Sequence, residues 1–204
     1  MYLTKITLSL ADRSIQRALG DCQQMHRLIM GLFDTDRASA NVLYRLRSAQ
    51  GAIAVYIYSS APLKSDRLTL GMKFAGERDM GPWLESLSEG QRWNFDLLAC
   101  PSKKVAVEGI KNSRRRILRT PDERADWLRH KAMQNGFAVM TVRELGSSQQ
   151  TGHHPAENGG RLYIDNYHYQ GTLQVTDAAL FRNVVSSGLG PGKAYGLGML
   201  LLTH

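Results

Sequence analysis

One histidine stands where an imidazole could take part in proton transfer. His26 lies between apolar Met25 and basic Arg27, within residues 21–33, a segment whose apolar side chains recur at helical spacing. Imidazole titrates near neutral pH, so it can give or take a proton there. Because His26 sits at the margin of the apolar stripe, it could face a cleft. From the pattern alone, a packed or surface histidine is the commoner case.

The positive charge of the chain is concentrated in one segment. The 204 residues include 26 Lys and Arg against 18 Asp and Glu, a net charge of +8, and residues 103–131 contribute ten basic and four acidic side chains. Such a cluster is typical of proteins that bind a polyanion, although a solvated helix face shows the same charge. A membrane surface is a weaker candidate, because no long apolar helix face accompanies the cluster.

A second unusual segment, residues 188–198, is rich in glycine. Its glycines are Gly188, Gly190, Gly192, Gly196 and Gly198. Without a Cβ, this backbone can approach a partner closely, or it can simply pack tightly at a turn. The expected order around it is helix, loop, strand, which excludes a dinucleotide-binding loop. Ala194 directly after Lys193 excludes a nucleoside-triphosphate loop.

The sequence offers no pattern typical of a metal site. His153 and His154 adjoin each other in a polar stretch without Cys or Asp at ligand spacing, and we expect them to be loop residues. The two cysteines, Cys22 and Cys100, form neither a disulfide framework nor a ligand cluster. We therefore expect no metal and no other cofactor. A reducing, cytoplasmic compartment is the simplest expectation, since the N-terminus also lacks a signal-peptide pattern.

Periodicity and turn residues predict the elements that position these side chains in the first half. They predict strands at 2–10, 42–48 and 52–59, a helix at 21–33 capped by Asp21, a strand near 68–74 and a short helix near 82–88. The last two are the weakest of these predictions. A domain boundary is expected at Glu89-Gly90, where turn-forming residues follow.

The second half shows the same order of elements. Its pattern predicts strands at 91–99, 137–145 and 196–203, helices at 121–134 and 177–187, and a hairpin at 161–169 and 171–176. Thr120-Pro121 is a strong helix start, and Asn135-Gly136 ends that helix. We expect residues 100–120 to form a basic loop and residues 146–160 a mobile one.

Two copies of one β-α-β-β-α-β pattern predict an α+β fold. We expect two tandem ferredoxin-like, or RRM-like, domains at 1–89 and 90–204, the second ending in the glycine-rich loop. Such domains expose one face of an antiparallel sheet, and RNA-recognition modules use that face. Trp83, Trp93 and Trp127 are expected in the cores or between the domains. Because a fold does not fix a function, the sites must carry the argument.

Several short segments carry a family resemblance, and their order and spacing make it specific. They are residues 1–5, Met25-His26-Arg27, residues 98–104, residues 120–129, residues 169–173 and the glycine-rich stretch. Together they resemble the CRISPR repeat-processing endoribonucleases, the subtype I-E CasE family, along the whole chain. Cys100 stands in the position of a family asparagine. Gln23 is a second departure, because some members carry a tyrosine three residues before the histidine.

The resemblance implies a metal-independent endoribonuclease. It would cut the CRISPR repeat transcript at the base of a hairpin, by attack of the RNA 2′-hydroxyl, and stay bound to the mature guide RNA among the other subunits of a surveillance complex. His26 would be the catalytic residue, with Arg27 and Lys193 as candidate phosphate stabilisers. The expected RNA-binding residues are basic side chains of the second half. They are Lys103, Lys104, Lys111, Arg114, Arg115, Arg116, Arg119 and Arg161.

Two other hypotheses stay open at this point. The chain could be a paired RNA-recognition fold that grips a hairpin without cutting it, and Gln23, which cannot exchange protons, keeps that alternative open. It could also be a structural subunit of a ribonucleoprotein that contacts protein more than RNA. The second alternative predicts that neutralising Arg114, Arg115 and Arg116 leaves the affinity for RNA unchanged.

Overall fold

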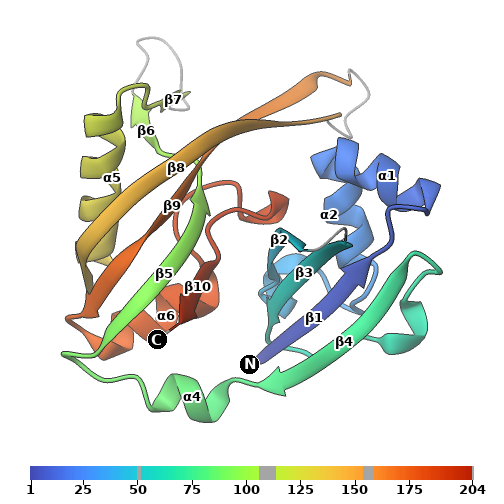
Figure 1. Cartoon of the computed structure of the whole chain (residues 1–204), viewed down its shortest axis with the longest axis horizontal. Helices are drawn as coiled ribbons and strands as arrows, with labels where there is room; N and C mark the ends of the chain where they lie inside the picture. The colour runs from blue at the N-terminus through green and yellow to red at the C-terminus, as the bar shows by residue number, and fades with distance from the viewer. Residues whose placement is uncertain (50–51, 106–113, 154–158, 204) are drawn as a thin grey trace.

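Two antiparallel four-stranded sheets make up the two halves of the molecule (Figure 1). The computed structural model describes residues 1–49, 52–105, 114–153 and 159–203, without the side chains of residues 37, 38, 49 and 114. The strand order is β2-β3-β1-β4 in the first sheet and β10-β5-β9-β8 in the second. The expectation of an α+β fold is therefore confirmed. In the described parts of the chain, no helix is long and apolar enough to cross a membrane.

The first half begins with a strand and two consecutive helices. Its elements are β1 (Tyr2–Leu8), α1 (Arg13–Gly20), α2 (Cys22–Met30), α3 (Arg37–Ala40), β2 (Leu43–Ala49), β3 (Ala52–Ser59), the 3-10 turn η1 (Ser65–Arg67), β4 (Met72–Asp79) and α4 (Gly81–Glu85). The sequence prediction missed α1, whose N-terminal N–H groups are capped by the Asp12 carboxylate. The short helix α3 was also missed. Strands β1, β2 and β3 and helix α2 lie close to their predicted ranges, whereas the weakly predicted strand near 68–74 is β4, shifted to Met72–Asp79 and followed by α4.

The second half has the order strand, helix, two strands, helix, strand, with one hairpin inserted after the first strand. Its elements are β5 (Arg92–Ala99), β6 (Ser102–Val105), β7 (Arg114–Ile117), α5 (Pro121–Gln134), β8 (Phe137–His153), β9 (Arg161–Val175), α6 (Ala178–Ser187), the 3-10 turn η2 (Lys193–Tyr195) and β10 (Leu200–Thr203). Thr120 and Glu123 form the capping box that starts α5, as the Thr120-Pro121 pair predicts. The predicted basic loop at 100–120 contains the short hairpin β6–β7 instead.

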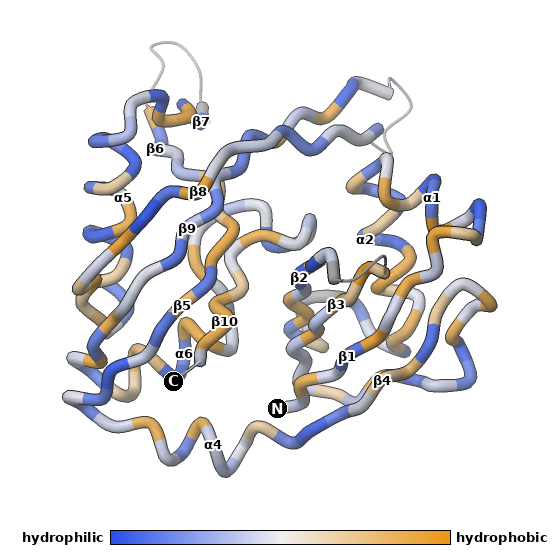
Figure 2. The backbone as a smooth tube through the Cα atoms, viewed as in Figure 1, coloured by the Kyte–Doolittle hydropathy of each residue, from blue (hydrophilic) through white to orange (hydrophobic). Residues whose placement is uncertain are grey.

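The largest error of the sequence prediction concerns β8 and β9. Residues 146–153, expected in a mobile loop, continue β8 and pair with residues 161–168. The predicted hairpin inside 161–176 is wrong, because those residues form the single strand β9. The far part of the β8–β9 hairpin is mostly polar (Figure 2). It reaches across the molecule to the start of α2, where Gly152 lies against Cys22 and Asp21.

The two halves share buried side chains. One apolar core, around Ile6, Ile29 and Val55, belongs to the first half alone. The other core belongs to the second half but also takes in Leu43 and Tyr58 from the first sheet. This shared burial holds the two sheets in a fixed arrangement, because the apolar area would return to water if they separated.

Helix α4 packs on the second half although it follows the first sheet in sequence. Its Trp83 meets Trp93 of β5 edge-to-face with ring centroids 5.6 Å apart. Arg182 of α6 donates hydrogen bonds to the carbonyls of Leu84 and Leu87. Trp93 and Trp127 are buried and Trp83 packs against the same core, as expected for the tryptophans.

A buried ion pair joins the two sheets. Arg45 of β2 donates to Asp96 of β5 at 2.9 Å, and their side chains are only 6% and 10% exposed. The other carboxylate oxygen of Asp96 accepts from Gln170 Nε2 at 2.8 Å and lies 2.9 Å from His168 Nε2. Burial pushes the pKa of Asp96 upward, but these hydrogen bonds and the Arg45 charge outweigh it and leave that pKa lowered.

Candidate active site and basic surface

Helix α2 presents His26 at the border between core and solvent. Asp21 starts the helix by accepting hydrogen bonds from the backbone N–H groups of Gln23 and Gln24. Met25 and Ile29 are buried, whereas His26 is half-buried. Since residues three apart share one side of a helix, Gln23 lies beside His26. The imidazole is therefore held by a packed helix and is not sealed in the core.

Tyr195 from the second half lies directly against this part of α2. Its ring and the His26 ring meet edge-to-face, with centroids 6.1 Å apart. Its hydroxyl donates a hydrogen bond to Gln23 Oε1 at 3.1 Å. Partial burial, and then the nearby Cys22, raises the pKa of Tyr195, so the phenol holds its proton firmly. Two aromatic, proton-bearing side chains thus meet at the junction of the halves.

The glycine-rich stretch shapes the turn that carries Tyr195. Gly192 and Gly196 flank η2 and both adopt the left-handed conformation, with φ of 82° and 78°. A Cβ on Gly196 would lie 2.9 Å from the Tyr44 ring. The Tyr44 hydroxyl in turn donates to the Ala194 carbonyl at 3.2 Å. The glycines therefore serve tight packing at a turn, the simpler of the two interpretations that their sequence allowed.

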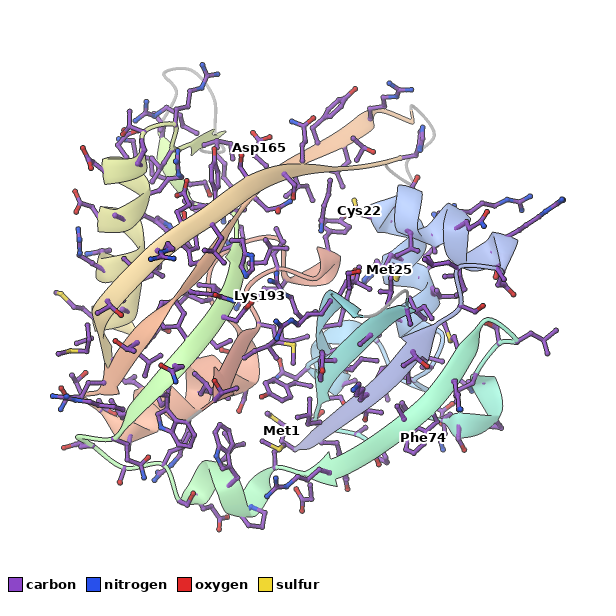
Figure 3. All side chains as sticks on the ribbon, in the orientation of Figure 1. Met1, Cys22, Met25, Phe74, Asp165 and Lys193 are labelled. Atoms are coloured by element: carbon purple, nitrogen blue, oxygen red, sulfur yellow. The ribbon has the colours of Figure 1, made fainter. Side chains whose placement is uncertain are left out.

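A cavity of about 160 Å³ opens beside this contact. Cys22 and Met25 of α2 line it together with Tyr44 and Tyr195, and residues 149–151 of β8 close it. Figure 3 labels Cys22 and Met25 on the side of α2 that faces the second half, and it labels Lys193, the first residue of η2. Three segments distant in sequence, α2, η2 and β8, therefore converge here.

The tip of the β8–β9 hairpin is fastened to the start of α2. His153 Nδ1 lies 2.8 Å from Asp21 Oδ2. Partial burial pushes the pKa of Asp21 upward, but the hydrogen bonds from His153 and from two backbone N–H groups lower it overall. His153 is thus the last residue of a strand and not a loop residue as predicted, and His154 lies outside the described residues. Within the described part of the chain, no three His, Cys, Asp or Glu side chains gather as metal ligands would.

Arg27 does not share the hollow that Tyr195 lines. It is exposed and borders a neighbouring hollow with Arg17 and His153. Arg161, at the start of β9, borders a third hollow that also contains His153. Arg27, predicted as a phosphate stabiliser, and Arg161, predicted to bind RNA, therefore both lie near the end of the hairpin that is docked on α2. Arg17 joins them without having been predicted.

A ladder of like charges covers the hairpin β6–β7. Lys103 faces Arg116 and Lys104 faces Arg115 across the two strands, and all four side chains are exposed. Like charges directly opposite each other destabilise a strand pair, so an anionic partner would relieve their repulsion. Arg116 also pairs with Glu123 at 3.0 Å.

Of the other predicted RNA-binding residues in this segment, only Arg119 has a described side chain. Arg119 is exposed directly after β7. Arg114 begins β7, but its side chain, like the whole of Lys111, lies outside the described residues.

The glycine-rich stretch also borders the basic hairpin. A hollow of about 450 Å³ is lined by cationic side chains of the hairpin and of α5, together with Gly190 and Pro191. Its basic lining residues are Lys103, Lys104, Arg115 and Lys131, with His130 beside them. One short segment thus contacts the basic surface at Gly190-Pro191 and His26 at Tyr195. The only signal for Tyr195 in the sequence is an aromatic residue in the middle of a glycine-rich turn, and the sequence interpretation passed over it.

Comparisons with known proteins agree along the entire chain. The family described as CRISPR associated protein matches residues 1–204. The chain is 28% identical over 211 residues to the CRISPR-associated endoribonuclease Cse3 of Thermus thermophilus, covering 98% of each. A solved structure of CRISPR endoribonuclease Cse3 bound to 19-nucleotide RNA has a TM-score of 0.86 and 27% identity, with 100% of both chains covered. A chain of a CRISPR RNA-guided surveillance complex, pre-nicking, has a TM-score of 0.76 at 21% identity, covers 100% and 99%, and shares the fold.

Proposed function

This chain belongs to the family of CRISPR-associated proteins, and from that premise we propose that it is a metal-independent endoribonuclease that cuts CRISPR repeat RNA at the base of the repeat hairpin. Whole-chain similarity to proteins named as CRISPR endoribonucleases supports this proposal. The observation that carries it is local. A half-buried imidazole, His26, sits at the junction of the halves against a turn whose other end borders a basic surface.

The reaction follows from what RNA itself supplies. The 2′-hydroxyl attacks the adjacent phosphorus, the bond from phosphorus to the 5′ oxygen breaks, and a 2′,3′-cyclic phosphate and a 5′-hydroxyl result. His26 exchanges a proton in this step, because a neutral imidazole accepts the 2′ proton as the new bond forms. Lys193, at the start of η2, and Arg27, on α2, supply positive charge near the phosphate. DNA is not cut, because it lacks the nucleophile.

We assign RNA binding mainly to basic side chains of the second half. The exposed ladder of Lys103, Lys104, Arg115 and Arg116 suits a duplex stem, since duplex RNA is recognised mainly through its shape and its phosphates. Arg119 extends this surface, Lys111 and Arg114 are assigned to RNA binding from the sequence alone, and Arg161 near the end of the long hairpin contacts the RNA near the cut. Such a surface holds the product as well as the substrate, because cutting one bond leaves the stem phosphates in place.

The two sheets are assigned to two ferredoxin-like domains with a boundary near residues 89 and 90. In each sheet the two central strands are the first and third of the half, which is the order that such a domain requires. The second half has both helices of the pattern, α5 and α6. The first half has only the 3-10 turn η1 where the second helix would lie. We assign the protein, bound to its guide RNA, to the cytoplasm as a subunit of a surveillance complex.

Incubation of the protein with a repeat hairpin RNA in EDTA tests the proposal. We expect cutting at one bond, with a 2′,3′-cyclic phosphate on the upstream product. A 2′-deoxy nucleotide at the cut should abolish cutting and leave the affinity unchanged, because only the nucleophile is lost. Tight binding of the unmodified RNA without cutting would favour the hairpin-binding module instead. Cutting that stops in EDTA and returns with Mg²⁺ would contradict metal independence.

A further inference from the structure

The proposed reaction needs two proton movements, and His26 accounts for one of them. As the 2′ oxygen bonds to phosphorus it loses a proton, and as the 5′ oxygen leaves it must gain one. An unassisted alkoxide is a poor leaving group, so a positioned acid speeds this step by about 10²- to 10⁴-fold. This inference rests on the proposed function and concerns the side chain that supplies the second proton.

The described side chains on this side of α2 offer few candidates. Gln23 cannot exchange a proton near neutral pH. Cys22 is buried, and that burial raises the pKa of its thiol. Tyr44 is 2% exposed and its hydroxyl is bonded to the Ala194 carbonyl. Arg27 borders a different hollow.

Tyr195 satisfies the geometric requirement. It is half-buried, touches the His26 ring, and aims its hydroxyl along the same side of α2, at Gln23 Oε1. Turn η2 holds it from both ends, through the left-handed Gly192 and Gly196. We propose that Tyr195 is a catalytic residue that donates its phenolic proton to the leaving 5′ oxygen while His26 takes the proton of the 2′-hydroxyl.

His26 gains one proton in the reaction and Tyr195 loses one. Attack by the 2′ oxygen moves one proton to the imidazole, and departure of the 5′ oxygen removes one from the phenol, leaving an imidazolium and a phenolate. A water molecule then carries the proton back from His26 to Tyr195, and both side chains return to their starting states. The raised pKa of Tyr195 fixes its role, because a phenol that keeps its proton can donate but cannot act as the base.

Gln23 has a positioning role in this scheme. In the free protein it accepts the hydrogen bond of Tyr195 and so keeps the hydroxyl beside His26. When RNA binds, the leaving oxygen replaces the Gln23 amide oxygen as the acceptor. A hydroxyl that is already oriented loses little conformational freedom on reaching the transition state.

A comparison of two RNAs with different leaving groups distinguishes a catalytic role of Tyr195 from a purely structural one. The full-length protein and Tyr195→Phe, which keeps the ring, are each given the natural RNA and an RNA with sulfur in place of the bridging 5′ oxygen at the cut. A thiolate leaves readily without a proton. We expect Tyr195→Phe to cut the natural RNA about 10²-fold more slowly and the sulfur RNA at nearly the wild-type rate. Its affinity for a 2′-deoxy RNA should equal that of the wild type.

Two further variants complete the test. His26→Ala should be slow on both RNAs, because the 2′ proton must be removed in either case. Tyr44→Phe, which loses a phenol of the same cavity, should be within about threefold of wild type on both. Equal loss by Tyr195→Phe on the two RNAs, or no loss, would overturn the inference while leaving the proposed function standing. Failure of the wild-type protein to cut either RNA would overturn both.

Discussion

The proposed reactive pair at the junction of the two sheets and the cations of β6–β7 are held in opposite ways. His26 and Tyr195 are half-buried, in ring contact, and held by a capped helix and a glycine-flanked turn. The cations of β6–β7 stand exposed on a short two-stranded ribbon and face like charges. A proton transfer loses rate when its partners shift by about 1 Å, whereas phosphate attraction acts over roughly a Debye length. The proposed proton transfer therefore requires side chains held in fixed, partly buried positions. Binding of RNA phosphates requires only a cluster of positive charge.

This contrast also explains why contacts between the halves matter. Tyr44 of the first half contacts Ala194 and Gly196 of the glycine-rich stretch, and Arg45 meets Asp96 in a buried pair. The proposed reactive pair is complete only where the two sheets join. The basic hairpin needs no such junction, because its side chains all come from one segment. Variants that break one region should therefore leave the other working.

The largest effect on RNA affinity is expected from removing the cationic ladder. Replacing all four side chains, Lys103, Lys104, Arg115 and Arg116, with alanine should weaken RNA binding by about 10²- to 10³-fold. The slope of the logarithm of affinity against the logarithm of salt concentration should become shallower by about 3. The single-turnover rate at saturating protein should stay within about threefold of wild type. Filter binding at several salt concentrations measures the first two quantities.

Removal of two exposed cations from a different surface provides the control. Lys73 and Arg78 are exposed cations on β4, at the far edge of the first sheet. Changing both to alanine should alter RNA affinity less than about threefold, since only general electrostatic attraction is reduced. If RNA affinity fell as much per removed charge as in the hairpin variant, the net charge of the protein, and not the ladder on β6–β7, would govern binding.

A smaller effect is expected from breaking the ion pair between the sheets. Asp96→Asn leaves the buried Arg45 charge without its counter-ion, so the free energy of unfolding should fall by about 3 kcal/mol in urea titrations. The pKa of Asp96 is lowered in the folded state, so its stabilisation is present above the unfolded value, near 4, and is lost as the pH falls further. The difference between wild type and variant should therefore shrink in acid.

An exposed ion pair on α5 provides the comparison for the buried pair of Arg45 and Asp96. Asp126 pairs with Arg129 at 3.0 Å on α5, but its side chain is 76% exposed. Asp126→Asn should cost about 0.5 kcal/mol or less, because water screens the pair. If the two variants were equally stable, the junction would not depend on the Asp96 pair.

Among the variants expected to slow cutting, Gly196→Ala should have the smallest effect. An alanine there must hold a left-handed φ and place its Cβ 2.9 Å from the Tyr44 ring, so the turn should shift at a cost of about 1–3 kcal/mol. Displacement of Tyr195 should slow cutting by about tenfold with little change in RNA affinity. Gly146→Ala, where no atom lies within 4 Å of the added Cβ, should change neither quantity.

The sequence predicted best those elements whose signals are local. Helix α5 begins at a capping box that four consecutive residues encode, and β2 and β3 follow from their alternation. The extension of β8 could not be predicted in this way. Residues 146–153 are polar on both faces, and they are ordered by pairing with β9 and by docking of Gly152 and His153 on α2. Tertiary contact overrode local preference there.

The same division applies to the candidate site. The position of His26 at the edge of an apolar stripe was visible within a single helix, and the resemblance of Met25-His26-Arg27 to the family selected it as the catalytic candidate. Tyr195 was missed because its proximity to His26 depends on a turn formed 169 positions later in the chain, with glycines at 192 and 196 setting its direction. His153 was missed for a similar reason, since only the docking of β8 on α2 brings it next to Arg27, and Arg17 was missed because helix α1, which contacts α2, was not predicted.

The most direct measurement compares wild type with His26→Ala on repeat hairpin RNA in EDTA, at saturating protein and in a single turnover. The account predicts a rate about 10³-fold lower for the variant, with an affinity for 2′-deoxy RNA within about twofold of wild type. His130→Ala, which removes an exposed histidine of α5 bordering the basic surface, should keep the wild-type rate. Cutting by His26→Ala at the wild-type rate would contradict the account.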